Sequence, residues 1–186
     1  MRRLCVFNNI SLDGYFTDKK NDMSWAHENA GDQEFQAFVN DNAKGGGELV
    51  FGRITYEMMA SFWPTPMAKE QMPEVAKQMN ALPKVVFSKT LKEVHWNNTR
   101  LFNTDLISDM KKLKNEEARD MVIFGSGKII TQLSQHRLID EYQFVINPLI
   151  LGQGRTMFEN LESKLKLKQT ESRTFKNGNV FVRYSI

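Results

Sequence analysis

The sequence predicts a three-layer α/β/α fold, with a central mixed, mostly parallel sheet and an antiparallel C-terminal hairpin. From the N-terminus to about residue 147, short apolar runs typical of buried strands alternate with segments of helical periodicity. The last residues, 180–186, instead alternate along a strand and follow a hairpin-turn signal at 176–179. We therefore predict helices on both faces of one sheet, within a single domain spanning residues 1–186.

Composition excludes several classes of protein. The chain has 186 residues, of which 41% are hydrophobic and 25% charged, so it can bury a core. A formal net charge of +3 is too small for a nucleic-acid-binding protein, but it suits an anionic small ligand. Cys5 is the only cysteine, which excludes an intrachain disulfide and favours a reducing compartment. No apolar run is long enough to span a membrane and no secretory signal is evident, so we expect a cytoplasmic protein.

The individual elements follow from periodicity and turn residues. Strands are expected at residues 4–10, 48–51, 84–87, 121–124 and 140–147, each an apolar run bounded by polar or glycine residues. Helices are expected after the N-cap Asp32, at 53–61, 74–81 and 105–115, and after residue 127. The three prolines between residues 62 and 73 predict a loop there. Short strands are expected at 94–96 and 100–102, around an Asn-Asn turn.

The strongest local pattern is an apolar strand that runs into Gly125-Ser126-Gly127-Lys128 and then a helix. The first N–H groups of a helix have no partner within it, and glycines let an anion approach the backbone closely. The pattern therefore fits phosphate binding, although an ordinary tight strand–helix connection has the same appearance.

Two more strand ends carry polar residues. Gly52 precedes Arg53, Ile54 and Thr55 at the start of a helix, where a cation is unfavourable for the helix dipole unless it meets an anion. Ser88 and Lys89 follow the strand at 84–87. Ligands of open α/β sheets bind beyond the carboxyl ends of the strands, so these residues are candidates for one dinucleotide site. A solvated arginine and a plain turn are the alternatives.

Asn9, Ser11 and Asp13 lie at and just after the end of the first strand and are candidates for substrate contacts, and Gly14 follows Asp13. Asp13 is placed to orient a substrate or to relay a proton through water, although an Asp-Gly turn has the same sequence. Trp25 is a candidate pocket wall, or alternatively a core residue. The three histidines lack metal-ligand spacing, so no metal site is expected.

In order along the chain, these segments resemble the family that contains dihydrofolate reductase and the C-terminal reductase domain of riboflavin biosynthesis. The resemblance runs from about residue 3 to the end and includes the segments 11–14, 52–57, 84–91, 125–127, 138–142 and 147–154. It implies that NADPH lies with its pyrophosphate at Gly52, Arg53, Ile54 and Thr55, and its 2′-phosphate by Ser88 and Lys89. It also implies that Gly125, Ser126, Gly127 and Lys128 line the diphosphate and nicotinamide side.

The resemblance further implies that Asp13 corresponds to the substrate-side aspartate of the riboflavin branch, and that the protein forms a homodimer. Two features of the family are missing. Asp32 and Glu34 do not align with the acidic residue that binds the pterin ring in dihydrofolate reductase, and no deaminase domain is present. We therefore expect a stand-alone NADPH-dependent reductase of a small C=N or C=O substrate, pteridine-like or pyrimidine-like. The alternative is a dinucleotide-binding protein of the same fold without turnover.

Overall fold

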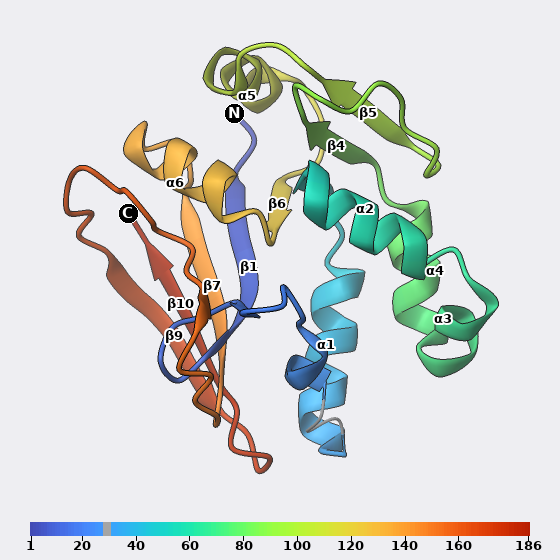
Figure 1. The fold of residues 1–186 in the computed structure, drawn as a ribbon, viewed down its shortest axis with the longest axis vertical. Coiled ribbons are helices and arrows are strands. Elements are labelled where there is room, and N and C mark those ends of the chain that lie inside the picture. The colour runs from blue at the N-terminus through green and yellow to red at the C-terminus, as the bar shows by residue number, and fades with distance from the viewer. Residues whose placement is uncertain (28–30) are drawn as a thin grey trace.

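A computed structural model, which describes residues 1–27 and 31–186, contains an eight-stranded sheet in the order β5-β4-β3-β6-β1-β7-β10-β9 (Figure 1). The strands from β5 to β7 are parallel, whereas β10 is antiparallel to both of its neighbours. This arrangement confirms the predicted fold class. The bounds are β1 Leu4–Ser11, β3 Glu48–Gly52, β4 Lys84–Phe87, β5 Thr99–Phe102, β6 Met121–Phe124, β7 Glu141–Asn147, β9 Lys168–Thr174 and β10 Val180–Ser185. The short strands β2 Thr17–Asp18 and β8 Gly154–Arg155 pair separately.

Helices cover both faces of the sheet (Figure 1). One face packs in two apolar clusters against α1 Gln33–Lys44, α2 Arg53–Phe62, α3 Pro66–Gln71 and α4 Pro73–Ala81. The opposite face packs against α5 Leu106–Asn115 and α6 Gly127–Gln135. A short 3₁₀ helix, η1 Ser24–His27, precedes α1. Among the described residues, no helix is both long and apolar enough to cross a membrane.

Two sequence expectations were wrong. The segment 62–73 is not a loop throughout, because α3 and the start of α4 lie within it. Prolines begin both helices, which costs nothing because the first N–H groups of a helix have no helical partner. Residues 94–96 do not form a strand, since the Tyr56 hydroxyl accepts the N–H groups of His95 and Trp96. The following strand, β5, pairs with β4 in parallel rather than forming a hairpin.

The topology places a crevice between β3 and β6. From β3 the chain continues through α2 to β4, away from the centre of the sheet, whereas from β6 it continues through α6 to β7 in the opposite direction. Neighbouring parallel strands that lead in opposite directions create a crevice at their carboxyl ends, where ligands of open α/β sheets bind. The segments following β3, β6 and β1 therefore form the expected site.

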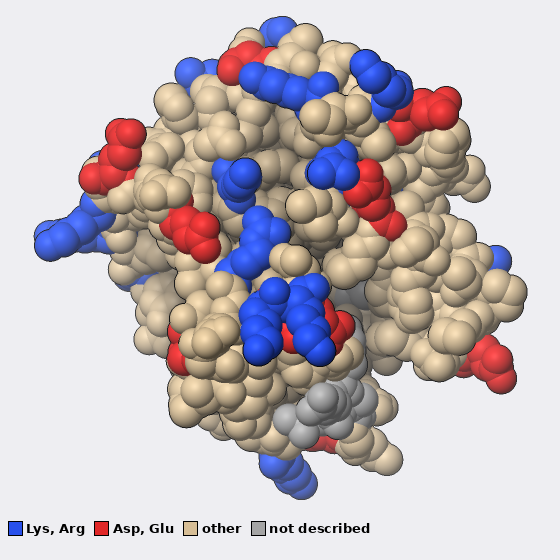
Figure 2. Space-filling view, in the orientation of Figure 1, with Lys and Arg blue, Asp and Glu red and all other residues tan. Residues whose placement is uncertain are grey.

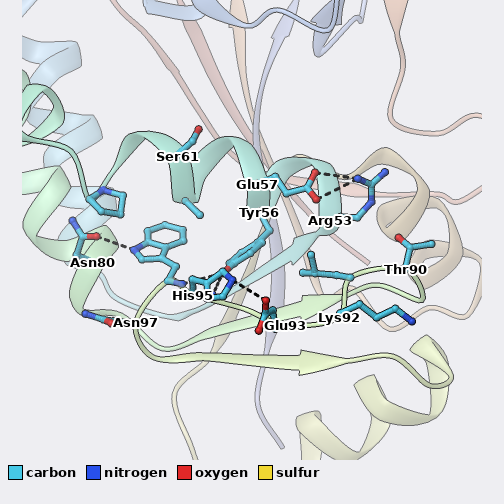
Figure 3. A pocket seen from close by; sticks show the side chains of 14 residues that line it. Arg53, Tyr56, Glu57, Ser61, Asn80, Thr90, Lys92, Glu93, His95 and Asn97 are labelled. Atoms are coloured by element: carbon cyan, nitrogen blue, oxygen red, sulfur yellow. Dashed lines mark hydrogen bonds and ion pairs between the residues drawn. The ribbon is translucent and has the colours of Figure 1, made fainter.

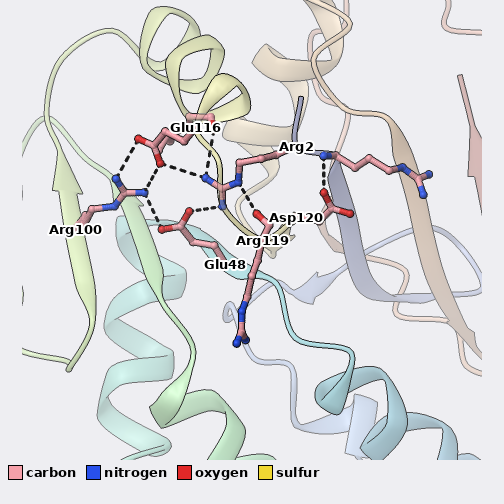
Figure 4. A network of polar contacts seen from close by, with 8 residues as sticks. Arg2, Glu48, Arg100, Glu116, Arg119 and Asp120 are labelled. Atoms are coloured by element: carbon pink, nitrogen blue, oxygen red, sulfur yellow. Dashed lines mark hydrogen bonds and ion pairs between the residues drawn. The ribbon is translucent and has the colours of Figure 1, made fainter.

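The opposite, amino edge of the sheet is joined by charged side chains (Figure 4). Glu48 lies between two arginines, with Oε2 2.6 Å from Arg2 Nη2 and Oε1 2.9 Å from Arg100 Nη2. Arg2 and Glu48 are buried, and Glu116 pairs with both arginines. This network connects the starts of β1, β3 and β5, far from the carboxyl ends, so we assign it to stability.

Candidate functional site

The ends of β3 and β6 are connected by one serine. Ser126 Oγ accepts the N–H of Gly52 at 2.7 Å and donates to Thr55 Oγ1 at 3.1 Å. The structure thus brings together Gly52, Thr55 and Ser126, which the sequence pattern places in two separate motifs. We call this contact the Gly52–Ser126 junction.

Glycine is required on both sides of the junction. Gly125 has a φ of +60°, and a Cβ there would lie 2.7 Å from Thr55 Oγ1. A Cβ on Gly52 would lie 2.8 Å from Ser126 Oγ. Both distances are shorter than a van der Waals contact, so any larger residue would separate α2 from α6.

The two helices that start at the junction have no side-chain caps. Gly52 is the N-cap of α2 and has no side chain that could cap the helix. Ser126 is the N-cap of α6, but its hydroxyl bonds the Gly52 N–H and Thr55 Oγ1 rather than an N–H group of its own helix. Uncapped N–H groups and the positive ends of two helix dipoles therefore lie next to each other. This arrangement suits an anion with more than one phosphate.

The two strand-end N–H groups are not free. The Gly52 N–H bonds Ser126, and the Gly125 N–H donates to Asn8 Oδ1 at 2.7 Å. A phosphate at the junction would therefore be bound by the first turns of α2 and α6 rather than by these two glycines. Ile54 and Lys128 lie in those turns and are exposed, whereas Gly127 is packed against Phe16 and the backbone of Thr156.

Arg53 borders a cavity on the flank of α2 (Figure 3). Its guanidinium pairs with Glu57 one turn along α2, Nη1 to Oε2 being 3.1 Å. The cavity, of about 920 Å³, lies between the flank of α2 and the segment that follows β4, and Tyr56 and Thr90 are among its lining residues. The pairing reduces the cost of a cation in the first turn of the helix, and a bound phosphate would compete with Glu57 for Arg53.

Ser88 and Lys89 lie at the end of β4, beside β3 but outside the junction. Ser88 Oγ accepts the N–H groups of Thr90 and Leu91, which makes it a turn-forming residue. Lys89 is exposed, and neither residue lines the cavity on the flank of α2, although the next residue, Thr90, does.

Asp13 holds two loops together. Its carboxylate accepts the hydroxyl of Ser11 at 2.6 Å and the N–H groups of Leu151 and Gly152 at 3.1 and 2.7 Å. The Ser11 bond and then the two backbone bonds lower the pKa of Asp13, so the carboxyl group is ionised at neutral pH. This geometry favours the orienting role over the proton-donating one.

The remaining substrate-side candidates lie at the end of β1 and in η1. Asn9 is half-buried, and its Oδ1 accepts a hydrogen bond from Asn147 Nδ2 at 3.2 Å. Trp25 is buried, with its indole N–H donating to the Asp22 carbonyl, so it is not an open pocket wall. A smaller cavity, of about 280 Å³, lies nearby and is lined by Ile10, Gly14, Phe144, Thr156, Met157 and Phe158.

Sequence reasoning did not single out Asn8 and Asn147, which lie on the strands that lead to the candidate site. Both are almost completely buried, and each has one amide atom without a partner: Nδ2 of Asn8 and Oδ1 of Asn147. Asn8 lies inside β1 and Asn147 is the last residue of β7, so an asparagine within or at the end of an apolar run was the available signal, because buried polar groups require partners.

The surface around these strand ends is basic. Figure 2 shows several Lys and Arg side chains down the middle of one face, from the start of α6 to the region of the loop that follows β1, with a few acidic side chains beside them. Across residues 1–27 and 31–186, no three His, Cys, Asp or Glu side chains gather as a metal ion would require. The charges and the helix ends both favour an anionic ligand.

Comparisons with known proteins identify the family and support the fold. Residues 2–181 match the family model of the RibD C-terminal domain. The uncharacterised protein YyaP of Bacillus subtilis is 26% identical over 98% of this chain and 94% of its own length, and YwjB of the same organism is 24% identical over 91% of both. A solved protein assigned to riboflavin biosynthesis, from Shewanella sp. PV-4, is 26% identical over 98% of both chains, with a TM-score of 0.75.

A bifunctional deaminase/reductase, diaminohydroxyphosphoribosylaminopyrimidine deaminase/5-amino-6-(5-phosphoribosylamino)uracil reductase from Thermotoga maritima, shares the fold. Its TM-score is 0.68 at 13% identity, and the match covers 99% of this chain and 56% of that protein. At this identity the match concerns the fold alone.

Proposed function

This chain belongs to the RibD C-terminal domain family, and on that premise we propose that it is an NADPH-dependent reductase of a small C=N or C=O substrate. The observation that carries the proposal is the pair of uncapped helix N-termini at the Gly52–Ser126 junction. In this proposal the diphosphate of the cofactor lies against the first turns of α2 and α6, contacting the backbone of residues 53–55 and 126–128.

The adenosine end has room on the α2 side. Arg53 and Thr90 both line the cavity of about 920 Å³, and Ser88 and Lys89 directly precede Thr90. We assign the 2′-phosphate to Arg53 and Lys89, since a phosphate would replace Glu57 as the partner of the guanidinium. This assignment predicts a preference for NADPH over NADH.

The cofactor supplies the hydride, and the chain supplies binding and orientation. Asp13 keeps the loop after β1 against residues 151–152, and Asn9 faces the substrate beside it. The substrate is proposed to be a pteridine-like or pyrimidine-like ring, and the protein is proposed to act as a homodimer.

A binding protein without turnover is favoured by one observation. Asp13, the residue expected to relay a proton, is ionised and bound by three donors. If a ligand that binds beside NADPH leaves the absorbance of the reduced nicotinamide unchanged under single-turnover conditions, the protein binds the dinucleotide without acting as a reductase.

The experiment for the proposal is a titration of tryptophan fluorescence with NADPH and, separately, NADH. We expect saturable binding, tighter for NADPH than for NADH, and weaker NADPH binding in Arg53→Ala than in the wild type. Lys166→Ala, which removes a positive charge from another exposed position, is the matched control and should bind NADPH as the wild type does. Absence of binding by both cofactors at millimolar concentration would remove the reductase hypothesis.

A further inference from the structure

Two asparagines on the α1 face of the sheet carry hydrogen-bonding groups that the described residues leave unused. Asn9 of β1 and Asn147 of β7 lie on adjacent parallel strands near the carboxyl edge, where Asn9 pairs with Val145 and Ser11 with Asn147. Val145 packs with Phe35 of α1, so these alternate residues of β7 face α1. The pair therefore lies on the side of the sheet opposite α6.

The orientation of the Asn147 amide is fixed by its neighbours. Its Nδ2 lies 3.2 Å from Asn9 Oδ1, 3.3 Å from the Ile10 carbonyl and 3.2 Å from the Val145 carbonyl. All three are acceptors, so the nitrogen must point toward them and the oxygen away. That oxygen, Oδ1, is buried and has no donor.

Asn9 is oriented by the same bond. Because its Oδ1 accepts from Asn147, its NH₂ group is turned away from that bond, and among the described residues no acceptor bonds it. The half-buried Asn9 thus offers a donor, and the buried Asn147 offers an acceptor beside it. Leaving a buried acceptor without a donor is unfavourable, and a ligand with the complementary groups would remove that cost.

We propose that Asn9 and Asn147 recognise the N–H/C=O edge of a cyclic amide, with Asn9 Nδ2 donating to the ring carbonyl and Asn147 Oδ1 accepting from the ring N–H. The inference deepens the proposed function, on which it rests, by naming the residues that select the substrate ring. A neutral edge is selected because neither partner carries a charge. Asn147 is shut off from solvent, so recognition of the ring requires the side chains that pack over Asn147 to move when the ring binds.

The test uses two probes that differ only in their ring N–H groups. Lumazine, a pteridine dione, has the amide edge, and its dimethylated form has methyl groups in place of both ring N–H donors. Binding is measured through the fluorescence of each probe, with and without NADPH. We expect the wild type to bind lumazine at least about tenfold more tightly than the dimethylated form. Asn147→Leu should lose this ratio.

A matched variant separates recognition from folding. Thr17 of β2, outside this sheet, is also buried, and its hydroxyl lacks a partner. Thr17→Val should keep the lumazine ratio, and thermal melts show whether each variant folds. Equal binding of the two probes by the wild type, or no binding of lumazine by a protein that binds NADPH, would overturn the inference but not the proposed function. Selective binding of lumazine by a protein that does not bind NADPH would overturn the proposed function and keep the recognition of the ring by Asn9 and Asn147.

Discussion

Removing the hydroxyl of Ser126 tests the Gly52–Ser126 junction. The hydroxyl makes two hydrogen bonds, one from the Gly52 N–H and one to Thr55 Oγ1. Each is worth about 1 kcal/mol, so Ser126→Ala should lower the free energy of unfolding by about 2 kcal/mol. Ser126 also has a left-handed φ of +64°, which costs a residue with a Cβ about 1 kcal/mol. Ser126→Gly loses the same hydrogen bonds but avoids this cost, so it should lose only about 1 kcal/mol.

Urea denaturation of the three proteins, followed by circular dichroism, measures both differences. The slope of the unfolding free energy with urea should stay constant, since the folded surface does not change. Two results would refute the reasoning: a Ser126→Ala variant as stable as the wild type, or a Ser126→Gly variant less stable than Ser126→Ala. The first would mean that the junction contributes nothing to stability. The second would mean that backbone strain at Ser126 is unimportant.

Three further predictions concern buried polar groups. Lys84 is fully buried, and burial lowers its pKa from 10.5 to about 8. Below about pH 8 the buried ammonium group is charged and destabilises the folded state. As the pH rises from about 8 to 10.5 the folded protein loses this charge before the unfolded protein does, so the free energy of unfolding of the wild type should rise by up to about 3 kcal/mol relative to Lys84→Met. Urea titration of both proteins at each pH measures this difference. Glu48→Gln should lower the free energy of unfolding by about 3 kcal/mol, because it removes the nearer and buried carboxylate partner of Arg2 and leaves only Glu116, 3.4 Å away. Arg100→Gln, which removes a half-exposed partner of Glu48, should cost less in the same urea titrations. Asn179→Leu should raise the unfolding free energy by about 1 kcal/mol, since it removes two buried unpartnered atoms, and a lower value would indicate that water satisfies them.

The sequence was sufficient for the central elements of the fold. Apolar runs such as residues 121–124 and the alternation after residue 180 correspond to β6 and β10, because burial on one or both faces of a strand leaves a direct record in residue type. Prolines were misleading between residues 62 and 73, since the same residue that breaks a helix interior also starts a helix. Residues 94–96 do not form a strand because the N–H groups of His95 and Trp96 bond the Tyr56 hydroxyl, a contact between segments about 40 residues apart that local sequence does not indicate.

The candidate site could be predicted only in part. The glycines at 52 and 125 were evident as strand-end signals, and the structure brings them to one junction. Local sequence could not indicate that Asn8 and Ser126 occupy the N–H groups of those glycines, because these contacts join segments 74 and 117 residues apart. The bonds from Asp13 to residues 151–152 were hidden for the same reason.

The central claim is that the first turns of α2 and α6 together bind the diphosphate of NADPH. An NADPH titration of ¹⁵N-labelled protein, followed by amide chemical shifts, tests this claim most directly. We predict the largest shifts at the amides of residues 53–55 and 126–128, with half-saturation at the same NADPH concentration for both groups. Shifts confined to one helix, or to residues 90–97 around the larger cavity, or no shifts at all, would contradict the claim.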